Sequence, residues 1–250
     1  MPSAPGVLCI PAFREADRLP PFLEGLIAVL APGPHLIRIQ IVDDGSPAEE
    51  RARLFAALKP RASGACSLAP PLALPANTRK GGAILAGWRA HPAAAWFAFV
   101  DADGAVPPAE VRRLLDHALA TPPPSAACFA VRRSGPSVRR DATRALAGRL
   151  FSALAERIAG RKLDDVQCGL KYVPAAAWRA LDPQFQGSGL CFDVELLARL
   201  ARLPCPITEF PIAWEEKNGG SIRLWPDAPR MLFQLARLSR ILPAYTLPPN

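Results

Sequence analysis

The feature that most constrains the fold is a regular alternation of short apolar runs with longer amphipathic segments between residues 7 and 131. Apolar runs of strand length occupy residues 7–10, 36–42, 96–100 and 126–131. Amphipathic segments of helix length lie between them, at residues 19–30, 47–58, 81–91 and 108–120. Strands that are apolar along their whole length indicate a sheet covered on both faces. The alternation predicts an α/β fold with a Rossmann-like, mainly parallel sheet and helices on both of its faces.

The rest of the chain continues this pattern less regularly. We expect a long basic helix at 141–159, a strand at 169–173, helices at 175–181 and 192–203, a strand at 207–214 and an amphipathic helix at 231–242. No internal repeat or linker divides the sequence. The pattern therefore predicts one α/β domain over residues 1–225, followed by a C-terminal amphipathic helix and tail at 226–250.

Composition excludes several classes of protein. Half of the 250 residues are hydrophobic, which suffices for a large core and argues against disorder. The sequence lacks an apolar run of about 18 residues, so we expect no transmembrane helix. The six cysteines form no C-x-x-C pair and the three histidines stand apart, which argues against zinc and favours a reducing, cytoplasmic location.

Most of the excess positive charge lies in one segment. The formal net charge is +8, and residues 131–162 hold nine basic and two acidic residues, a balance of +7. A focused positive field indicates an anionic partner such as a phosphate group, an acidic lipid or a nucleic acid. The segment offers only Phe151 for base stacking and has no nucleic-acid-binding motif, so we expect no nucleic acid.

Acidic and polar residues follow the predicted strands at the points where the strands end. Glu15 follows the first strand, Asp43 and Asp44 the second, and Asp101 and Asp103 the third. The carboxyl ends of parallel strands form the usual ligand-binding edge of such a sheet. Clustered carboxylates there favour a hard cation, and Mg²⁺ or Mn²⁺ takes one or two carboxylates together with ligand phosphates. A single D-x-D pattern is weak, because acidic turns are common.

Two further local patterns concern helix starts. The stretch NTRKGG at 77–82 opens a helix, and paired glycines, a helix N-terminus and two cations favour an anionic ligand. Ser46 and Glu49 have the spacing of a capping box and predict the start of the second helix.

The ordered set of motifs is more specific than any member. The motifs are IPAFRE at 10–15, IVDDGS at 41–46, NTRKGG at 77–82, FVDADG at 99–104, DVQCGLK at 165–171, CFDVELL at 191–197 and PIAW at 211–214. In this order they resemble glycosyltransferase family 2, and most of all its branch of dolichyl-phosphate β-glucosyltransferases and polyprenyl-phosphate glycosyltransferases. The resemblance extends from about residue 7 to 225.

The resemblance implies a GT-A fold, a nucleotide-diphosphate sugar donor, bound Mg²⁺ or Mn²⁺ and inversion at the anomeric carbon. It assigns donor binding to Pro11, Phe13, Glu15, Asp43, Asp44, Lys80, Gly81, Asp101, Ala102 and Asp103. Asp103, with Asp101 beside it, would hold the metal. The acceptor phosphate would be bound by Arg133 and one of the arginines that follow it, namely Arg139, Arg140, Arg144 or Arg149.

The acceptor class follows from charge. A phosphate monoester is already anionic at neutral pH and needs cations to position it, so the arginine cluster favours a phosphate acceptor. Together with this, the resemblance implies a polyprenyl phosphate as acceptor and a donor such as UDP-glucose. The alternative is a hydroxyl acceptor, which needs a general base, and Asp165 and Asp193 are the candidates. A more distant alternative is a non-catalytic module that binds phosphate or nucleic acid. Peripheral contact with a membrane through residues 227–242 and homo-oligomer formation both stay open.

Overall fold

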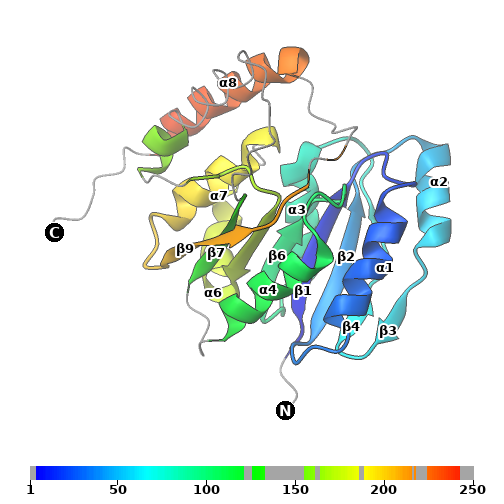
Figure 1. Ribbon diagram of the computed structural model, residues 1–250. Coiled ribbons are helices and arrows are strands. Elements are labelled where there is room, and N and C mark those ends of the chain that lie inside the picture. Colours follow the sequence, from blue (N-terminus) through cyan, green and yellow to red (C-terminus); the bar gives the residue numbers. More distant parts are fainter. Residues whose placement is uncertain are drawn as a thin grey trace.

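A twisted sheet forms the centre of the protein, as the computed structural model in Figure 1 shows. The structure describes residues 4–120, 126–132, 155–160, 164–185, 189–215, 217 and 224–242. Within these residues the strand order is β3-β4-β2-β1-β6-β8-β7-β9, and the short β5 pairs with β2.

Most strands of the sheet run in one direction. They are β1 (Gly6–Ala12), β2 (Ile37–Asp43), β4 (Cys66–Leu68), β5 (Leu72–Ala73), β6 (Trp96–Val100), β7 (Ala127–Arg132) and β9 (Ile207–Ile212). The antiparallel members are β3 (Arg61–Ser63), which pairs with β4, and β8 (Leu170–Pro174), which lies between β6 and β7. The predicted mainly parallel α/β sheet is confirmed.

Helices cover both faces of the sheet, as predicted. One core layer holds α1 (Leu19–Leu30), α2 (Ala48–Ala57) and α4 (Pro108–Leu119). The other holds α3 (Arg79–Arg89), α6 (Ala175–Leu181), α7 (Phe192–Leu200) and α8 (Leu224–Ile241). Two short 3₁₀ turns, η1 (Asp182–Gln184) and η2 (Gly189–Cys191), precede α7. None of the helices within the described ranges combines the length and apolarity that crossing a bilayer demands.

Several local expectations were wrong. The strand β1 does not end with the apolar run at residue 10 but continues to Ala12, because Pro11 and Ala12 still pair in register with Val42 and Asp43. The capping box is not formed: Pro47 is the N-cap of α2, and no side chain among the described residues caps this helix. The Ser46 hydroxyl instead accepts a hydrogen bond from the backbone N–H of Arg14 at 2.9 Å, which ties the loops after β1 and β2 together.

The predicted basic helix at 141–159 falls outside the described residues, except for 155–159, which are helical.

The helix α3 is held tightly on the sheet. The Trp88 indole donates to the Ala98 carbonyl at 3.0 Å and packs edge-on against Trp178. At Gly87 the helix backbone comes so close to β1 and β2 that an added Cβ would lie 2.5 Å from Cys9 Sγ and 3.0 Å from Val42 Cγ2. This packing determines where the first turn of α3, with Lys80, meets the end of the sheet.

Gly87→Ala tests this close approach. Alanine is preferred to glycine inside a helix by about 1 kcal/mol, so an unhindered site would become more stable. Because the Cβ collides with Cys9 and Val42, we expect the free energy of unfolding to fall by about 1–3 kcal/mol in urea denaturation. In a Cys9→Ala background, which removes the sulfur atom, the same substitution should cost less. A Gly87→Ala variant as stable as the parent would contradict the packing.

Candidate functional site

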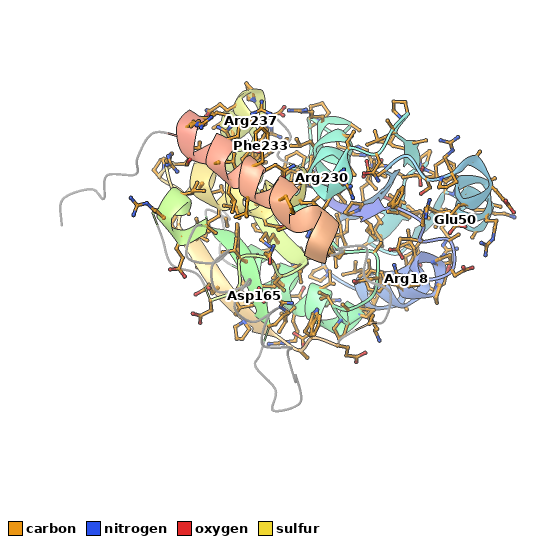
Figure 2. The ribbon with its side chains drawn as sticks, turned by 90° about the horizontal axis from the view of Figure 1, so that it is seen from above. Arg18, Glu50, Asp165, Arg230, Phe233 and Arg237 are labelled. Atoms are coloured by element: carbon orange, nitrogen blue, oxygen red, sulfur yellow. The ribbon has the colours of Figure 1, made fainter. Side chains whose placement is uncertain are left out.

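The predicted donor-binding residues and the two candidate bases meet at one edge of the sheet. The strands β1, β2, β6 and β7 end there, the antiparallel β8 begins there, and α3 and α7 start there. The edge therefore carries side chains from distant parts of the sequence. Figure 2 looks down on this side of the molecule, with Asp165 and Arg18 labelled on different parts of it.

A chain of alternating charges occupies the middle of this edge. The Lys80 ammonium lies 2.9 Å from Asp101 Oδ1 and 3.4 Å from Asp193 Oδ2. The Lys171 ammonium lies 2.8 Å from Asp193 Oδ1 and donates to the Cys168 carbonyl at 2.6 Å. Two lysines and two aspartates thus compensate one another in a line from β8 through α7 and α3 to β6. We call these four residues the charge network.

The strand register explains why Lys171 belongs to this network. Lys171 pairs with Phe99 of β6 and Phe129 of β7, and its ammonium lies 5.4 and 5.1 Å from the centres of their rings. Its side chain is fully buried, so its charge requires a counter-ion. Asp193 supplies that counter-ion from the first turn of α7.

Burial and pairing oppose one another in the network. Burial alone would lower the pKa of Lys80, but the carboxylates of Asp101 and Asp193 more than compensate and raise it. Burial alone would raise the pKa of Asp193, yet Lys171 and Lys80 bring it below its ordinary value. Both groups therefore carry their charges at neutral pH.

The loop after β6 places Asp101 and Asp103 differently. The Asp101 N–H donates to the Gly169 carbonyl at 2.9 Å, and a Cβ at position 169 would lie 2.1 Å from Asp101 Oδ2. Only glycine at 169 leaves room for that carboxylate. Asp103 Oδ1 accepts a hydrogen bond from the Ala105 N–H at 3.0 Å, and Ala102 between the two aspartates is buried. Among the described residues, Asp103 forms no ion pair.

Glu15 completes an acidic group with these two aspartates. Burial raises the pKa of Glu15, its partner Arg18 opposes this, and the charges of Asp103 and Asp101 raise it further. Burial also raises the pKa of Asp101, although Lys80 opposes the shift. Carboxylates that repel one another in this way are a suitable place for a cation.

The geometry fits Mg²⁺ or Mn²⁺ held jointly by protein and ligand. In the described part of the chain, no three histidine, cysteine or acidic side chains form a cluster that could hold a metal alone. Mg²⁺ in nucleotide sites usually takes one or two carboxylates and completes its shell with water and phosphate oxygens. Asp103, with Asp101 near it, is a ligand set of that size.

The two aspartates at the end of β2 have different partners. Asp43 is fully buried; its Oδ2 accepts from the Ser46 N–H at 3.2 Å, whereas its Oδ1 accepts no hydrogen bond from the described residues. Asp44 Oδ1 accepts from both the N–H and the hydroxyl of Thr78, each at 2.7 Å. Asp44 therefore holds the loop before α3, while Asp43 keeps one oxygen for a donor that a ligand can bring.

The remaining predicted donor residues border the same edge of the sheet. Pro11 and Phe13 are half-buried at the end of β1, and the Arg14 guanidinium lies 5.3 Å from the Phe13 ring centre. Gly81, in the first turn of α3, packs against Phe192, since a Cβ there would lie 2.7 Å from Phe192 Cβ.

A second ion pair flanks the charge network. The Arg132 guanidinium at the end of β7 binds both oxygens of Asp165, at 2.5 and 2.9 Å. It also lies 5.1 Å from the Trp214 ring centre. Arg132 and Asp165 thus form one fixed unit near the start of β8. The predicted acceptor arginines Arg133, Arg139, Arg140, Arg144 and Arg149 lie outside the described residues.

Two residues of this site, Lys171 and Arg132, were not predicted. In the sequence, Lys171 ends the motif DVQCGLK inside a predicted strand, and Arg132 is one of the nine basic residues of segment 131–162, but neither was assigned to the site. Their partners come from remote motifs, so local patterns do not reveal the pairs.

Comparison with known proteins agrees with the fold. The model of the family described as Glycosyl transferase family 2 matches residues 7–176. The chain therefore belongs to glycosyl transferase family 2, and the predicted resemblance to the dolichyl-phosphate β-glucosyltransferase branch is confirmed.

Two relatives carry that resemblance. Dolichyl-phosphate beta-glucosyltransferase of Saccharomyces cerevisiae is 30% identical over 183 residues, which cover 68% of this chain and 54% of the yeast protein. The protein of the same name from Dictyostelium discoideum is 25% identical over 239 residues, covering 92% of this chain and 72% of the relative. The chain thus spans about half the length of the yeast relative.

The solved structures support the fold. Glucosyl-3-phosphoglycerate synthase from Mycobacterium tuberculosis, crystallised with Mn²⁺, uridine diphosphate and phosphoglyceric acid, superposes with a TM-score of 0.65 at 16% identity. The superposition covers 94% of this chain and 78% of the mycobacterial chain. The predicted GT-A fold is confirmed.

Asp193→Asn tests whether the charge network stabilises the fold. Removing one charge of a buried pair costs about 3–5 kcal/mol, because Lys171 stays buried without its counter-ion. Since the folded-state pKa of Asp193 is lowered, its contribution should be complete above the unfolded value near ~3.9 and decline as pH falls below it. Urea denaturation of parent and variant from pH 7 to 3 measures both effects.

The matched control is Asp182→Asn, which weakens the partly exposed ion pair between Asp182 and Arg89. We expect that change to cost less than about 1 kcal/mol at pH 7. Equal costs for the two variants, or a cost for Asp193→Asn that grows as pH falls, would contradict the assignment.

Proposed function

We propose that this protein transfers one sugar from a nucleotide-diphosphate sugar, UDP-glucose or a similar donor, to a polyprenyl phosphate, with inversion at the anomeric carbon. The names of the two eukaryotic relatives support the acceptor class. The ligands of the mycobacterial structure support a uridine nucleotide and a divalent metal.

The donor end of the site is built from three groups. Asp43 Oδ1, buried and without a partner among the described residues, suits a donor group on the base or ribose. Asp103, with Asp101 beside it, would hold Mg²⁺ or Mn²⁺, which neutralises the negative charge that develops on the leaving diphosphate. Lys80, positioned by Asp101 and Asp193, adds a fixed positive charge at the start of α3.

The observation that carries the choice of acceptor is the pairing of both candidate bases. Asp193 lies between two ammonium groups that lower its pKa, and Asp165 accepts two hydrogen bonds from Arg132. The lowered pKa makes Asp193 a weak proton acceptor, and both oxygens of Asp165 are occupied by the Arg132 guanidinium, so neither carboxylate is well placed to activate a hydroxyl. A phosphate monoester, with a second pKa near ~6, needs no base at neutral pH.

The acceptor also needs cations, and the sequence supplies them nearby. Arg132 ends β7 at the site edge, and the basic segment continues directly from it through Arg133. We assign the acceptor phosphate to Arg133 and one of Arg139, Arg140, Arg144 and Arg149. In this proposal Asp165 is a positioning residue that orients Arg132.

A release assay tests the proposal. Uridine diphosphate release from UDP-glucose with Mn²⁺ should rise strongly when a polyprenyl phosphate is added and stay low with the corresponding polyprenol. Asp165→Asn retains a hydrogen-bond acceptor for Arg132, so we expect less than about a tenfold loss, whereas loss of a general base costs about 10²–10⁴-fold. The exposed neighbour substitution Asp164→Asn is the matched control and should leave the rate unchanged.

Two results would contradict the proposal. Equal release of uridine diphosphate with the polyprenyl phosphate and with the polyprenol would rule out a phosphate acceptor. A loss of 10²-fold or more in Asp165→Asn, with Asp164→Asn unaffected, would favour the alternative function, transfer to a hydroxyl with Asp165 as base.

A further inference from the structure

The helix α8 has one face packed on the protein and one face exposed. Leu235, Leu238 and Leu242 are buried in the core layer that also contains α3 and α7. The carbonyl of Met231 accepts a hydrogen bond from the Cys191 thiol of η2 at 3.5 Å. These contacts orient α8 on the protein and leave its other face exposed.

The exposed face combines positive charge with large apolar side chains. Arg230, Phe233, Arg237 and Arg240 recur at helical spacing and form one stripe opposite the buried leucines. Phe233 is 71% exposed, and Leu232 beside the stripe is 48% exposed. Figure 2 labels three of these residues along the helix. The sequence from 229 to 242 contains no acidic residue.

We propose that this exposed face of α8 binds the surface of an anionic lipid bilayer. Arginines on the polar side and phenylalanine and leucine inserted among the head groups are the chemistry of a helix that lies in the membrane interface. Cations near an anionic membrane surface each strengthen binding. The exposed side chains of Phe233 and Leu232 supply the apolar part, and Arg230 and Arg240 supply the charge complementarity.

A second copy of the chain fits this face less well than a bilayer. A two-fold interface brings the same patch of both subunits together, so the arginine stripe would face its own copy. With no acidic residue between 229 and 242, that interface would place like charges opposite one another. Lipid phosphates neutralise the stripe without this repulsion.

The position of α8 gives the contact a consequence for the site. Figure 1 shows α8 above α7, on the side of the molecule where the parallel strands end. Its inner face contacts η2, and Gly189 of η2 in turn approaches Gly81 in the first turn of α3, since a Cβ at Gly81 would lie 2.9 Å from the Gly189 carbonyl oxygen. A bilayer bound to α8 would therefore lie on the same side as the donor site.

Vesicle cosedimentation of the full chain, without donor or polyprenyl phosphate, tests the inference. The probes are phosphatidylcholine vesicles with and without phosphatidylglycerol. We expect binding to the anionic vesicles only, weakening as salt increases. Phe233→Ser should reduce the partition coefficient about tenfold, and Arg230→Gln and Arg240→Gln about fivefold each.

Matched controls lie at the opposite edge of the sheet. Leu36→Ser removes another exposed apolar side chain, and Arg38→Gln another exposed arginine at the start of β2. Both variants should bind like the parent. Circular dichroism and thermal unfolding should show that all variants are folded.

Several outcomes would overturn the inference. They are absence of vesicle binding, equal binding to neutral vesicles, and binding that the α8 variants leave unchanged. A dimer in sedimentation velocity that Phe233→Ser dissociates would assign the face to a second copy instead. The inference goes beyond the proposed function, because binding is measured without turnover. If the protein does not bind vesicles but its release of uridine diphosphate still depends on polyprenyl phosphate, only the membrane inference is wrong. If it binds anionic vesicles but its release of uridine diphosphate does not depend on polyprenyl phosphate, only the proposed function is wrong.

Discussion

The interaction on which the site depends is the burial of the Lys171 ammonium between two phenylalanine rings. A charge in that position needs a carboxylate, and Asp193 at the start of α7 provides one. The other oxygen of Asp193 then approaches Lys80, and Lys80 pairs with Asp101. One buried cation thus connects β8, α7, α3 and β6.

The network also distinguishes the carboxylates at the sheet edge. Asp193 and Asp101 are compensated by lysines, Glu15 by Arg18, and Asp165 by Arg132. Asp103 forms no ion pair among the described residues, and its negative charge raises the pKa of both Glu15 and Asp101. Among the carboxylates in and around the loop after β6, Asp103 is therefore the one whose negative charge a bound cation would relieve most. The carboxylates that already have a positive partner hold the site together, and Asp103, which has none among the described residues, is left to bind a cation.

The strand–helix alternation and the acidic strand ends could be predicted, because both are local properties of the sequence. The helix α1 and the strand β6 have the predicted bounds, and the parallel arrangement brings their loops to one edge. Ser46 was predicted to cap α2 because its spacing to Glu49 fits, but the neighbouring loop offers its hydroxyl another partner, the Arg14 N–H. The antiparallel insertion of β8, and with it the position of Lys171, depends on pairing with β6 and β7. Such pairing joins residues that are far apart in the sequence. The position of Lys171 in an apolar strand therefore did not indicate that its partner is Asp193.

Calorimetric titration of uridine diphosphate, with and without Mn²⁺, tests the central claim about Asp103 most directly. The account predicts that Mn²⁺ strengthens nucleotide binding to the parent protein and that Asp103→Asn removes this enhancement while the protein stays folded. Nucleotide affinity that is the same with and without Mn²⁺, or an Asp103→Asn variant that keeps the full enhancement, would contradict it.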